Sequence, residues 1–555
     1  MKKMKKFLAM LLTMVMVMGM SLTTFAAEVE VPSTPLTPPS HTPTKNDVAK
    51  AEVTNVEAGA TVTAYRIVEP TYNDKGFTGY KLAAGVTLAD MLEPTSDEVT
   101  GIAANKTLLG TLTQKQLNAP TGATGLTTYT APLEAGYWVV VVEGSEIQEV
   151  YNPMLIGIYY RVDGSGDDNT LVNGTVDANT DWSLESTPAY AKSEQPTIDK
   201  KITGSTGKDT SDGNESGNDV AIGDTVNFEI DTKIPSYSKS YTEVMVKITD
   251  TMGKGLTLAD PANLVVKVNN AEVKAGDDTF TYTEANDRKR FEISFASAYA
   301  LAHSGEAVVV TYDAVLGEDA GLNFDANDNT VKLEYTNDPS GETNEIEDKT
   351  YTYTFGIDSK LFGQGSEEWN KVTEELLKTG EWIKVEENGE IVEKPGPLKG
   401  AEFTLTNDET KKAYTAISDE NGHLAFTGLD AGKYTLQETK APEGYSLNDA
   451  KIPVEITTNY NEDGTLASYV IKVNGENTST YEATYSKDKV VTNIVCKPNE
   501  NDWSDVSDTH EIKNTKLSAL PSTGGIGTTI FTVGGCAIMI IAAGLYFATR
   551  RKSAK

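Results

Sequence analysis

The chain has 555 residues, of which 39% are hydrophobic and 23% charged, and its formal net charge is −33 at pH 7. A charge this negative argues against nucleic acid and anionic membranes as partners, and the ordinary apolar content argues against a disordered acidic tail. The length is sufficient for three domains of ordinary size.

The N-terminus carries a basic cluster, then an uncharged apolar run over about residues 7–22, then small residues at Ala26 and Ala27. This order predicts a secretory signal peptide over residues 1–26, cleaved after Ala26. An anchoring helix is the weaker alternative because the apolar run is short. Residues 27–47 are rich in Pro, Ser and Thr and predict a flexible or polyproline leader.

Short runs of Val, Ile, Thr, Tyr and Phe, separated by Gly, Asn and Asp, fill most of the remaining chain. Such runs predict an all-β fold made of tandem β-sandwiches. The exception is residues 366–380, whose apolar spacing predicts an amphipathic helix inserted in the third domain.

Two stretches of polar composition divide this region, one Ser/Pro-rich near residues 186–196 and one acidic near residues 337–349. They predict three domains, at residues 48–190, 193–350 and 351–516. A weak repeat between Leu133–Gly144 and Leu429–Lys440 indicates that the first and third domains are related, although chance similarity at a turn remains an alternative.

The C-terminus reads Leu520, Pro521, Ser522, Thr523 and Gly524, then an apolar stretch over about residues 526–548, then a basic tail. The stretch is long enough to span a bilayer, and the tail would stay inside. An ordinary membrane anchor explains the stretch and the tail, but it does not explain the five residues before them.

These parts, ordered as they are over residues 520–555, resemble the sorting signal that sortases read in Gram-positive surface proteins. The resemblance implies cleavage between Thr523 and Gly524, with the Thr523 carbonyl passed to an amine. The protein would then be secreted and attached to the cell wall after transient membrane anchoring. Since each removed end carries four positive charges, the mature net charge is about −33 − 8 = −41. Cys496 would be the one remaining cysteine, so an exported chain would lack any internal disulfide.

Two further resemblances point to the same family. GAEFTL at Gly400–Leu405 and the stretch Gly428–Tyr445 resemble the collagen-adhesin B-type module, including the pilin E-box. PTIDKKI, GDTVNFEI, VKITDTMGKGLT and YTND resemble the A-type module. The resemblance implies a shaft pilin built of Ig-like sandwiches, in which a lysine and an asparagine join in an isopeptide bond beside a catalytic Asp or Glu.

That chemistry places physical demands on the residues. The lysine must be neutral to attack a carboxamide, and the acid must be protonated, and burial favours both states. The acid can then polarise the Asn carbonyl and transfer protons as ammonia leaves. All three side chains should therefore lie on the apolar face of their strands.

In the middle domain this rule selects Lys200, Asp250 and Asn337, because each shares the parity of its strand's apolar residues. Lys201 is the alternative lysine. The competing interpretation is that each of these polar residues merely ends a strand.

In the third domain Glu438 and Asn514 are in phase with their strands, and Lys360 is the predicted lysine although a bulge would be needed to turn it inward. Asn493 is an alternative acceptor. A Lys360–Asn514 bond would close a loop of 514 − 360 = 154 residues and contribute roughly 5 kcal/mol. In the first domain Val142 stands where Glu438 stands in the third, so no such bond is predicted there.

Shaft pilins carry an acceptor lysine in a motif of the form WxxxVxVYPKN between the first two domains. Here Trp182 and Tyr190-Ala191-Lys192 resemble it, with Ala191 in place of the proline and Ser193 in place of the asparagine. The resemblance implies that Lys192 accepts the Thr523 carbonyl of the next subunit. A solvated linker lysine is the alternative, as for any exposed Lys.

Other chemistry finds no support. The four histidines show no metal spacing, and a faint calcium-loop pattern at residues 325–336 lacks the required Gly and Glu. We expect no cofactor and no enzyme activity beyond autocatalytic cross-linking. The implied partners are pilus-specific and housekeeping sortases, identical subunits, minor pilins and peptidoglycan. A monomeric wall-anchored adhesin, or a minor pilin at the base or tip, is the competing function.

Overall fold

The computed structural model describes residues 41–144, 147–162, 175–206, 208–209, 214–362, 372–497, 509–517 and 526–552. The chain separates into two compact units, unit 1 with residues up to 142 and 152–192, and unit 2 with residues 143–151 and 193 onward. The predicted signal peptide, most of the leader, and the sorting motif at 520–524 lie outside the described residues.

Unit 1 has a three-stranded sheet of order β11-β1-β5 and a seven-stranded sheet of order β10-β8-β6-β2-β3-β9, with β4 paired to β2. Its elements are β1 (Val48–Glu57), β2 (Thr61–Asn73), β3 (Gly76–Leu82), α2 (Ser96–Ala104), α3 (Lys106–Leu109), β4 (Gln114–Leu117), β5 (Leu126–Glu134), β6 (Gly136–Glu143), β8 (Met154–Val162), β9 (Val176–Asp177), β10 (Trp182–Ser186) and β11 (Ala189–Tyr190).

Strand β6 of unit 1 is buried on both faces, which explains its uninterrupted apolar sequence. Helix α2 covers one face, where Val99 and Ile102 join Val139 and Val141 in one apolar cluster. A capping box at Thr95 begins this helix, because the Thr95 side chain and Glu98 satisfy each other's backbone N–H groups.

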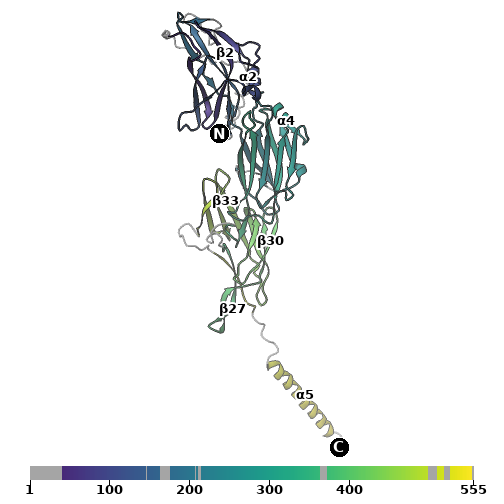
Figure 1. Ribbon diagram of the computed structural model, residues 1–555. Coiled ribbons are helices and arrows are strands. Elements are labelled where there is room, and N and C mark those ends of the chain that lie inside the picture. The colour runs from purple at the N-terminus through teal and green to yellow at the C-terminus, as the bar shows by residue number, and fades with distance from the viewer. Residues whose placement is uncertain are drawn as a thin grey trace. The chain divides into compact units, whose positions relative to one another are not determined.

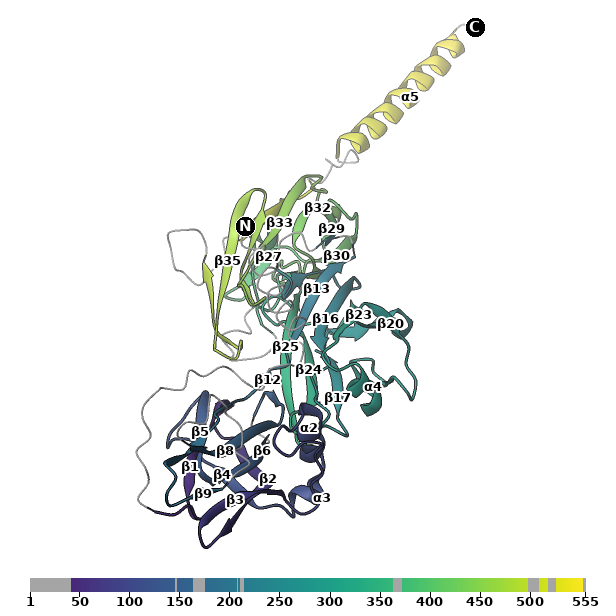
Figure 2. The same cartoon turned by 90° about the horizontal axis from the view of Figure 1, so that it is seen from above.

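The middle domain, in unit 2, has a seven-stranded sheet of order β14-β13-β16-β23-β19-β20, with β18 paired to β23, and a six-stranded sheet of order β15-β25-β24-β17-β22-β21. Strands β13, β16 and β23 run side by side (Figure 2). The elements are β13 (Ile198–Ser205), β14 (Lys208–Asp209), β15 (Gly217–Asp219), β16 (Thr225–Lys233), β17 (Val246–Met252), β18 (Leu256–Leu258), η1 (Pro261–Asn263), β19 (Val265–Val268), β20 (Ala271–Val273), β21 (Phe280–Glu284), β22 (Arg290–Phe295), α4 (Ser297–Ala302), β23 (Ala307–Leu316), β24 (Asn327–Thr336) and β25 (Thr343–Tyr353).

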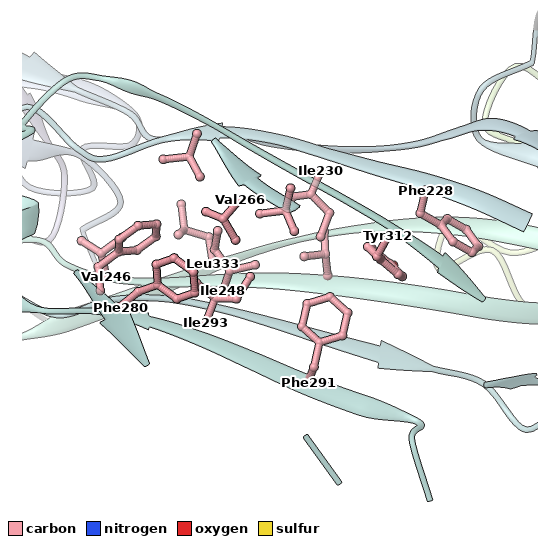
Figure 3. Packing of buried hydrophobic residues seen from close by; sticks show 14 of the residues in the cluster. Phe228, Ile230, Val246, Ile248, Val266, Phe280, Phe291, Ile293, Tyr312 and Leu333 are labelled. Carbon is pink, nitrogen blue, oxygen red and sulfur yellow. The ribbon is translucent and has the colours of Figure 1, made fainter. Parts of the chain in front are cut away.

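The core of the middle domain lies between these two sheets. Buried and partly buried residues alternate along β23 and β24, as expected of strands with one face inward. Ile230 and Tyr312 from one sheet and Ile248 and Leu333 from the other meet in one cluster (Figure 3). The residues at 143–151 join this unit through β7 (Val150–Tyr151), which pairs with β12 (Ser193–Glu194).

The C-terminal domain has a seven-stranded sheet of order β30-β29-β32-β33-β34-β35-β36, a three-stranded sheet of order β28-β27-β37, and the pair β26-β31. Labels for β27, β30 and β33 mark it in Figure 1. Its strands are β26 (Phe355–Ile357), β27 (Leu376–Glu387), β28 (Glu390–Pro397), β29 (Glu402–Asn407), β30 (Ala413–Ile417), β31 (Phe426–Leu429), β32 (Gly432–Lys440), β33 (Lys451–Tyr460), β34 (Leu466–Val473), β35 (Glu476–Tyr485), β36 (Val491–Lys497) and β37 (His510–Asn514).

The fold is thus all-β with tandem sandwiches, as predicted, but the predicted helix at 366–380 requires correction. Residues 376–380 begin strand β27, which pairs in parallel with β37, while residues 366–371 lie outside the described residues. Leu376 and Lys378 are fully buried on alternate positions, so the apolar spacing that suggested a helix also fits a strand with a period of two. Strand β25 continues past the proposed boundary at residue 350, since Tyr351 still pairs with Asp328.

Helix α5 (Ile526–Lys552) follows the sorting motif. Among the residues described, none of the helices combines the length and apolarity needed to cross a bilayer.

A pair of buried carboxyl groups lies near the start of β27. The Asp358 carboxylate accepts hydrogen bonds from the backbone N–H groups of Glu375 (2.8 Å), Leu376 (3.0 Å) and Leu424 (2.7 Å). Glu375 accepts one from the Asp358 N–H at 2.8 Å and one from the Tyr481 hydroxyl. Burial, and then the neighbouring Glu375 charge, raise the pKa of Asp358 to about 8, and burial raises the pKa of Glu375.

This pair predicts a pH-dependent stability of the C-terminal domain. Because both pKa values are raised on folding, the stabilising contribution is complete below the unfolded pKa near 4 and is lost as the pH rises through about 8. Scanning calorimetry from pH 5 to 9 should therefore show the unfolding temperature of this domain falling. Glu375→Gln, which keeps the shape without a titrating group, should flatten that dependence. An unchanged slope in the variant would show that other groups cause the effect.

Candidate cross-linking sites

The first candidate site lies in the core of the middle domain, where Lys200 reaches Asp250 across the two sheets. Lys200 is 1% exposed and Asp250 is 0% exposed. The Lys200 Nζ donates to Asp250 Oδ2 and to the Tyr312 hydroxyl, which itself donates to Asp250 Oδ2 at 2.8 Å. The Nζ also lies 5.1 Å from the Phe228 ring centroid. A lysine amine and a carboxyl group therefore share a dry apolar core.

Burial controls the protonation of both groups. It lowers the pKa of Lys200, although the nearby Asp250 carboxylate opposes the shift. Burial likewise raises the pKa of Asp250, opposed by Lys200. Both directions favour the neutral amine and the protonated acid, which are the states that attack on a carboxamide requires.

An asparagine completes this cluster, and it is Asn329 rather than Asn337. Asn329 is fully buried on β24 and its Nδ2 donates to the Tyr312 hydroxyl at 2.8 Å. It pairs across the sheet with Met252, next to the pair formed by Asp250 and Val331. Oδ1 of Asn329 and Oδ1 of Asp250 both lack hydrogen-bond partners among the described residues. A proton on the Asp250 carboxyl group would supply one of the missing donors.

The predicted acceptor Asn337 lies elsewhere. Its Nδ2 donates to the carbonyl groups of Gly144 at 3.0 Å and Ile147 at 2.7 Å, so it fastens the 143–151 segment. Asn329 and Asn337 share the same strand parity, which is why the alternation rule could not separate them. Asn337 lies six residues beyond Val331, the residue opposite Asp250, which is roughly 20 Å along a strand.

The alternative lysine, Lys201, forms ion pairs with Asp231 and Asp199 and is partly exposed. Burial acts to lower its pKa, but the hydrogen bond and charge of Asp231 outweigh it, so that the pKa of Lys201 is raised. It stays protonated and is unsuited to nucleophilic attack.

The second candidate site lies in the C-terminal domain and joins Lys378, Glu438 and Asn514. All three are at most 2% exposed. Lys378 Nζ donates to Asn514 Oδ1 at 2.5 Å and lies 3.6 Å from Glu438 Oε1, to which Asn514 Nδ2 donates at 2.8 Å. Burial lowers the pKa of Lys378, opposed by Glu438. Glu438 therefore holds the Asn514 carboxamide through its NH₂ group, while the carboxamide oxygen of Asn514 faces the Lys378 amine.

Lys360, the predicted lysine of this domain, is exposed, and its backbone carbonyl accepts a hydrogen bond from Asn323 Nδ2 at 2.8 Å. Strand β27, which begins at Leu376 and pairs in parallel with β37, instead carries the buried lysine, Lys378. In a strand, Lys378 lies on the same face as Leu376 and Gly380, and this period of two indicates that it is buried. The prediction of a helix over 366–380 applies a different period and therefore misses Lys378. Asn493, the alternative acceptor, is exposed on β36.

Unit 1 presents Lys192 at its surface. The Lys192 side chain is exposed, while its backbone carbonyl accepts a hydrogen bond from the Asn152 N–H at 3.2 Å. The preceding Ala191 is buried, and its carbonyl accepts from Asn55 Nδ2 at 3.0 Å. Every lysine of unit 1 that the structure describes is exposed, so none of them meets the burial that an internal isopeptide bond requires: Lys45, Lys50, Lys75, Lys81, Lys106, Lys115 and Lys192.

Four family models match the chain. Residues 46–193 match a T6 antigen Ig-like domain, and residues 222–339 match the Cna-B-like domain of Gram-positive pilin backbone subunit 2. Residues 379–483 match a prealbumin-like fold domain, and residues 512–555 match an LPXTG cell wall anchor motif.

Two relatives agree with these matches. The trypsin-resistant surface T6 protein of Streptococcus pyogenes serotype M6 is 28% identical over 92% of this chain and 96% of its own. The solved structure of the T6 backbone pilin from serotype M6 superimposes with a TM-score of 0.57 at 22% identity, covering 86% of this chain and 100% of that chain. The likeness in structure establishes the shared fold.

The middle site predicts which asparagine loses ammonia. Asn329→Ala should leave the mature protein heavier by about one unreleased ammonia, apart from the substitution itself, because the Asn329 carboxamide and the Lys200 amine meet at the same Tyr312 hydroxyl. Asn337→Ala, the control, should keep the full mass deficit. Intact-mass spectrometry reads both. A mass deficit lost in Asn337→Ala and kept in Asn329→Ala would reverse the assignment.

The C-terminal site predicts that Lys378→Met abolishes the second ammonia loss and lowers the unfolding temperature of that domain. A Lys378–Asn514 bond closes a loop of 514 − 378 = 136 residues, which contributes roughly 5 kcal/mol by chain entropy. Lys360→Met, at an exposed position, is the matched control and should leave the number of lost ammonia molecules and the unfolding temperature unchanged. A wild-type deficit of three ammonia molecules would contradict the expectation that unit 1 carries no such bond.

Proposed function

We propose that this chain, which belongs to the Gram-positive backbone pilins, forms a pilus shaft through two different kinds of amide bond. It is a structural subunit that is secreted, processed by sortase at its LPXTG motif and displayed at the cell wall. One kind of bond lies inside each subunit, and the other joins one subunit to the next.

One observation supports the internal bonds: lysine, acid and asparagine are buried together in two clusters, which we call triads. In each triad the neutral amine attacks the Asn Cγ, a new Cγ–Nζ amide bond forms, and the Cγ–Nδ2 bond breaks. Asp250 or Glu438 donates a proton to the carboxamide and accepts one from the amine, so that the products are an amide and ammonia. Since Lys200 and Asn329 come from opposite sheets, their bond would tie the two halves of the middle sandwich.

The bond between subunits is the transfer of the Thr523 carbonyl to Lys192. The Thr523–Gly524 peptide bond breaks, a thioester forms on the sortase, and the Lys192 amine replaces the thiol to give an amide. Two features support Lys192 as this acceptor. Its side chain is exposed to a bulky enzyme, while the backbone on either side of it is held by Asn55 and Asn152.

The finer partners follow from the same chemistry. A pilus-specific sortase would join the subunits, a housekeeping sortase would transfer the finished polymer to peptidoglycan, and minor pilins would occupy its ends. We also propose the three domains at 48–190, 193–350 and 351–516 as the repeating unit of the shaft, with β25 extending the second to Tyr353 and residues 143–151 grouped with unit 2.

The acceptor can be tested in cells that express the pilus. Lys192→Arg should abolish the high-molecular-weight ladders that survive boiling in detergent, because a guanidinium stays protonated and cannot attack the thioester. Lys115→Arg, at another exposed lysine of unit 1, should leave the ladders intact. Tryptic mass spectrometry of wild-type polymer should find Thr523 joined to Lys192. Thr523 found only on wall peptide would instead indicate a monomeric anchored adhesin.

A further inference from the structure

An exposed apolar surface lies at one end of the C-terminal domain. Trp382 is 54% exposed, Leu447 is 51% exposed and Leu517 is 59% exposed. We call these three residues the Trp382 face. Strand β27, which carries Trp382, is labelled at the lower end of the C-terminal domain in Figure 1.

Hydrogen bonds hold the three segments of this face together. The Leu517 N–H donates to the Gly444 carbonyl at 2.8 Å, and Tyr445 forms an isolated bridge with Lys516. The Lys516 Nζ donates to the Trp382 carbonyl at 3.4 Å and pairs with Glu393 at 3.0 Å. The Lys513 Nζ lies 3.8 Å from Glu381 Oε1 and forms a second ion pair. The apolar residues thus have a charged rim, as in surfaces that bind other proteins.

The backbone at Trp382 is in a conformation that a bulky residue rarely adopts. Its φ is +57°, and the pairing of β27 with β28 shifts register between Gly380 and Ile383, which marks a bulge. Left-handed backbone at a large side chain is strained, and such strain gathers at functional positions. The Trp382 side chain is exposed to solvent at this bulge. Packing in the core of its own domain therefore does not explain why a bulky residue has this strained backbone.

The chain beyond this face limits what can cover it. Thr523 lies six residues after Leu517, so the new amide carbon lies within roughly 20 Å of Leu517 even when the segment is fully extended. This argument rests on the proposed bond from Thr523 to Lys192. Once that bond forms, the surface around Lys192 of the next subunit is confined near the Trp382 face, and that surface presents Tyr190, which is 66% exposed.

We propose that the Trp382 face is the noncovalent docking surface for a second copy of this chain, and that it receives the surface around Tyr190 and Lys192 of that copy. The contact would hold the acceptor amine near the sorting motif and stiffen the joint after the bond has formed. Its apolar centre and charged rim suit a contact that must exist both before and after covalent linkage.

Photo-cross-linking in assembled pili tests this. The photoreactive amino acid p-benzoylphenylalanine replaces Trp382 in the full chain, and the control places it at Ile417, which is 64% exposed on β30 of the same domain. After irradiation, tryptic mass spectrometry should find position 382 joined to a peptide near residues 189–194, and position 417 not joined to it. The same cross-link should be weaker in unassembled Lys192→Arg chains, because no covalent bond raises the effective concentration of the second copy there.

The outcomes separate the two proposals. Polymer with the Thr523–Lys192 bond but no cross-link from position 382 to the neighbouring copy overturns the docking surface alone. Polymer joined through another lysine overturns both proposals. A cross-link that forms only within single chains, so that cross-linked Lys192→Arg protein runs as a monomer on a denaturing gel, would also overturn the docking surface. Trp382→Ala, with its internal ammonia losses intact as a check of folding, should slow ladder formation several-fold, and unchanged ladder kinetics would count against the proposal.

Discussion

The structure depends on placing an amine and a carboxyl group where water cannot reach them. In water Lys200 and Asp250 would be a charged pair with little to gain from contact. Between two sheets, beside Phe228 and Tyr312, both charges become costly and the neutral forms gain. A buried ion pair is normally a doubtful source of stability, but here the same burial would be the condition for forming the proposed covalent bond. The sandwich therefore has to close before its cross-link can form.

This requirement connects the composition to the fold. Neither cysteine of the described chain is in a disulfide, so the proposed bonds in the two triads would supply the covalent ties that exported domains often take from disulfides. Each triad uses strands far apart in sequence, β13 with β24 in the middle domain and β27 with β37 in the C-terminal domain.

Much of this could be predicted from the sequence, and the failures have a common cause. Alternation along strands indicates which face a residue occupies, and it led to Lys200, Asp250, Glu438 and Asn514, all of which are buried. It does not indicate how far along the partner strand a residue lies, so Asn337 was selected although Asn329 lies beside Asp250. Lys360 is out of phase with the apolar residues before it and is exposed, while the buried Lys378 lies in the stretch 366–380 whose spacing suggests a helix. The position along a strand depends on pairing between distant segments, which local pattern does not record.

The long loops enclosed by the two triads have a consequence for a filament that is pulled from its end. The proposed bond from Lys200 to Asn329 would carry the load past 329 − 200 = 129 residues, a stretch of chain that could otherwise lengthen by roughly 440 Å when fully extended. The loop closed in the C-terminal domain withholds a similar length. A fibre built from such subunits would respond to drag as a nearly inextensible cord, and its length under flow would be set by the number of subunits rather than by how many of them had unfolded.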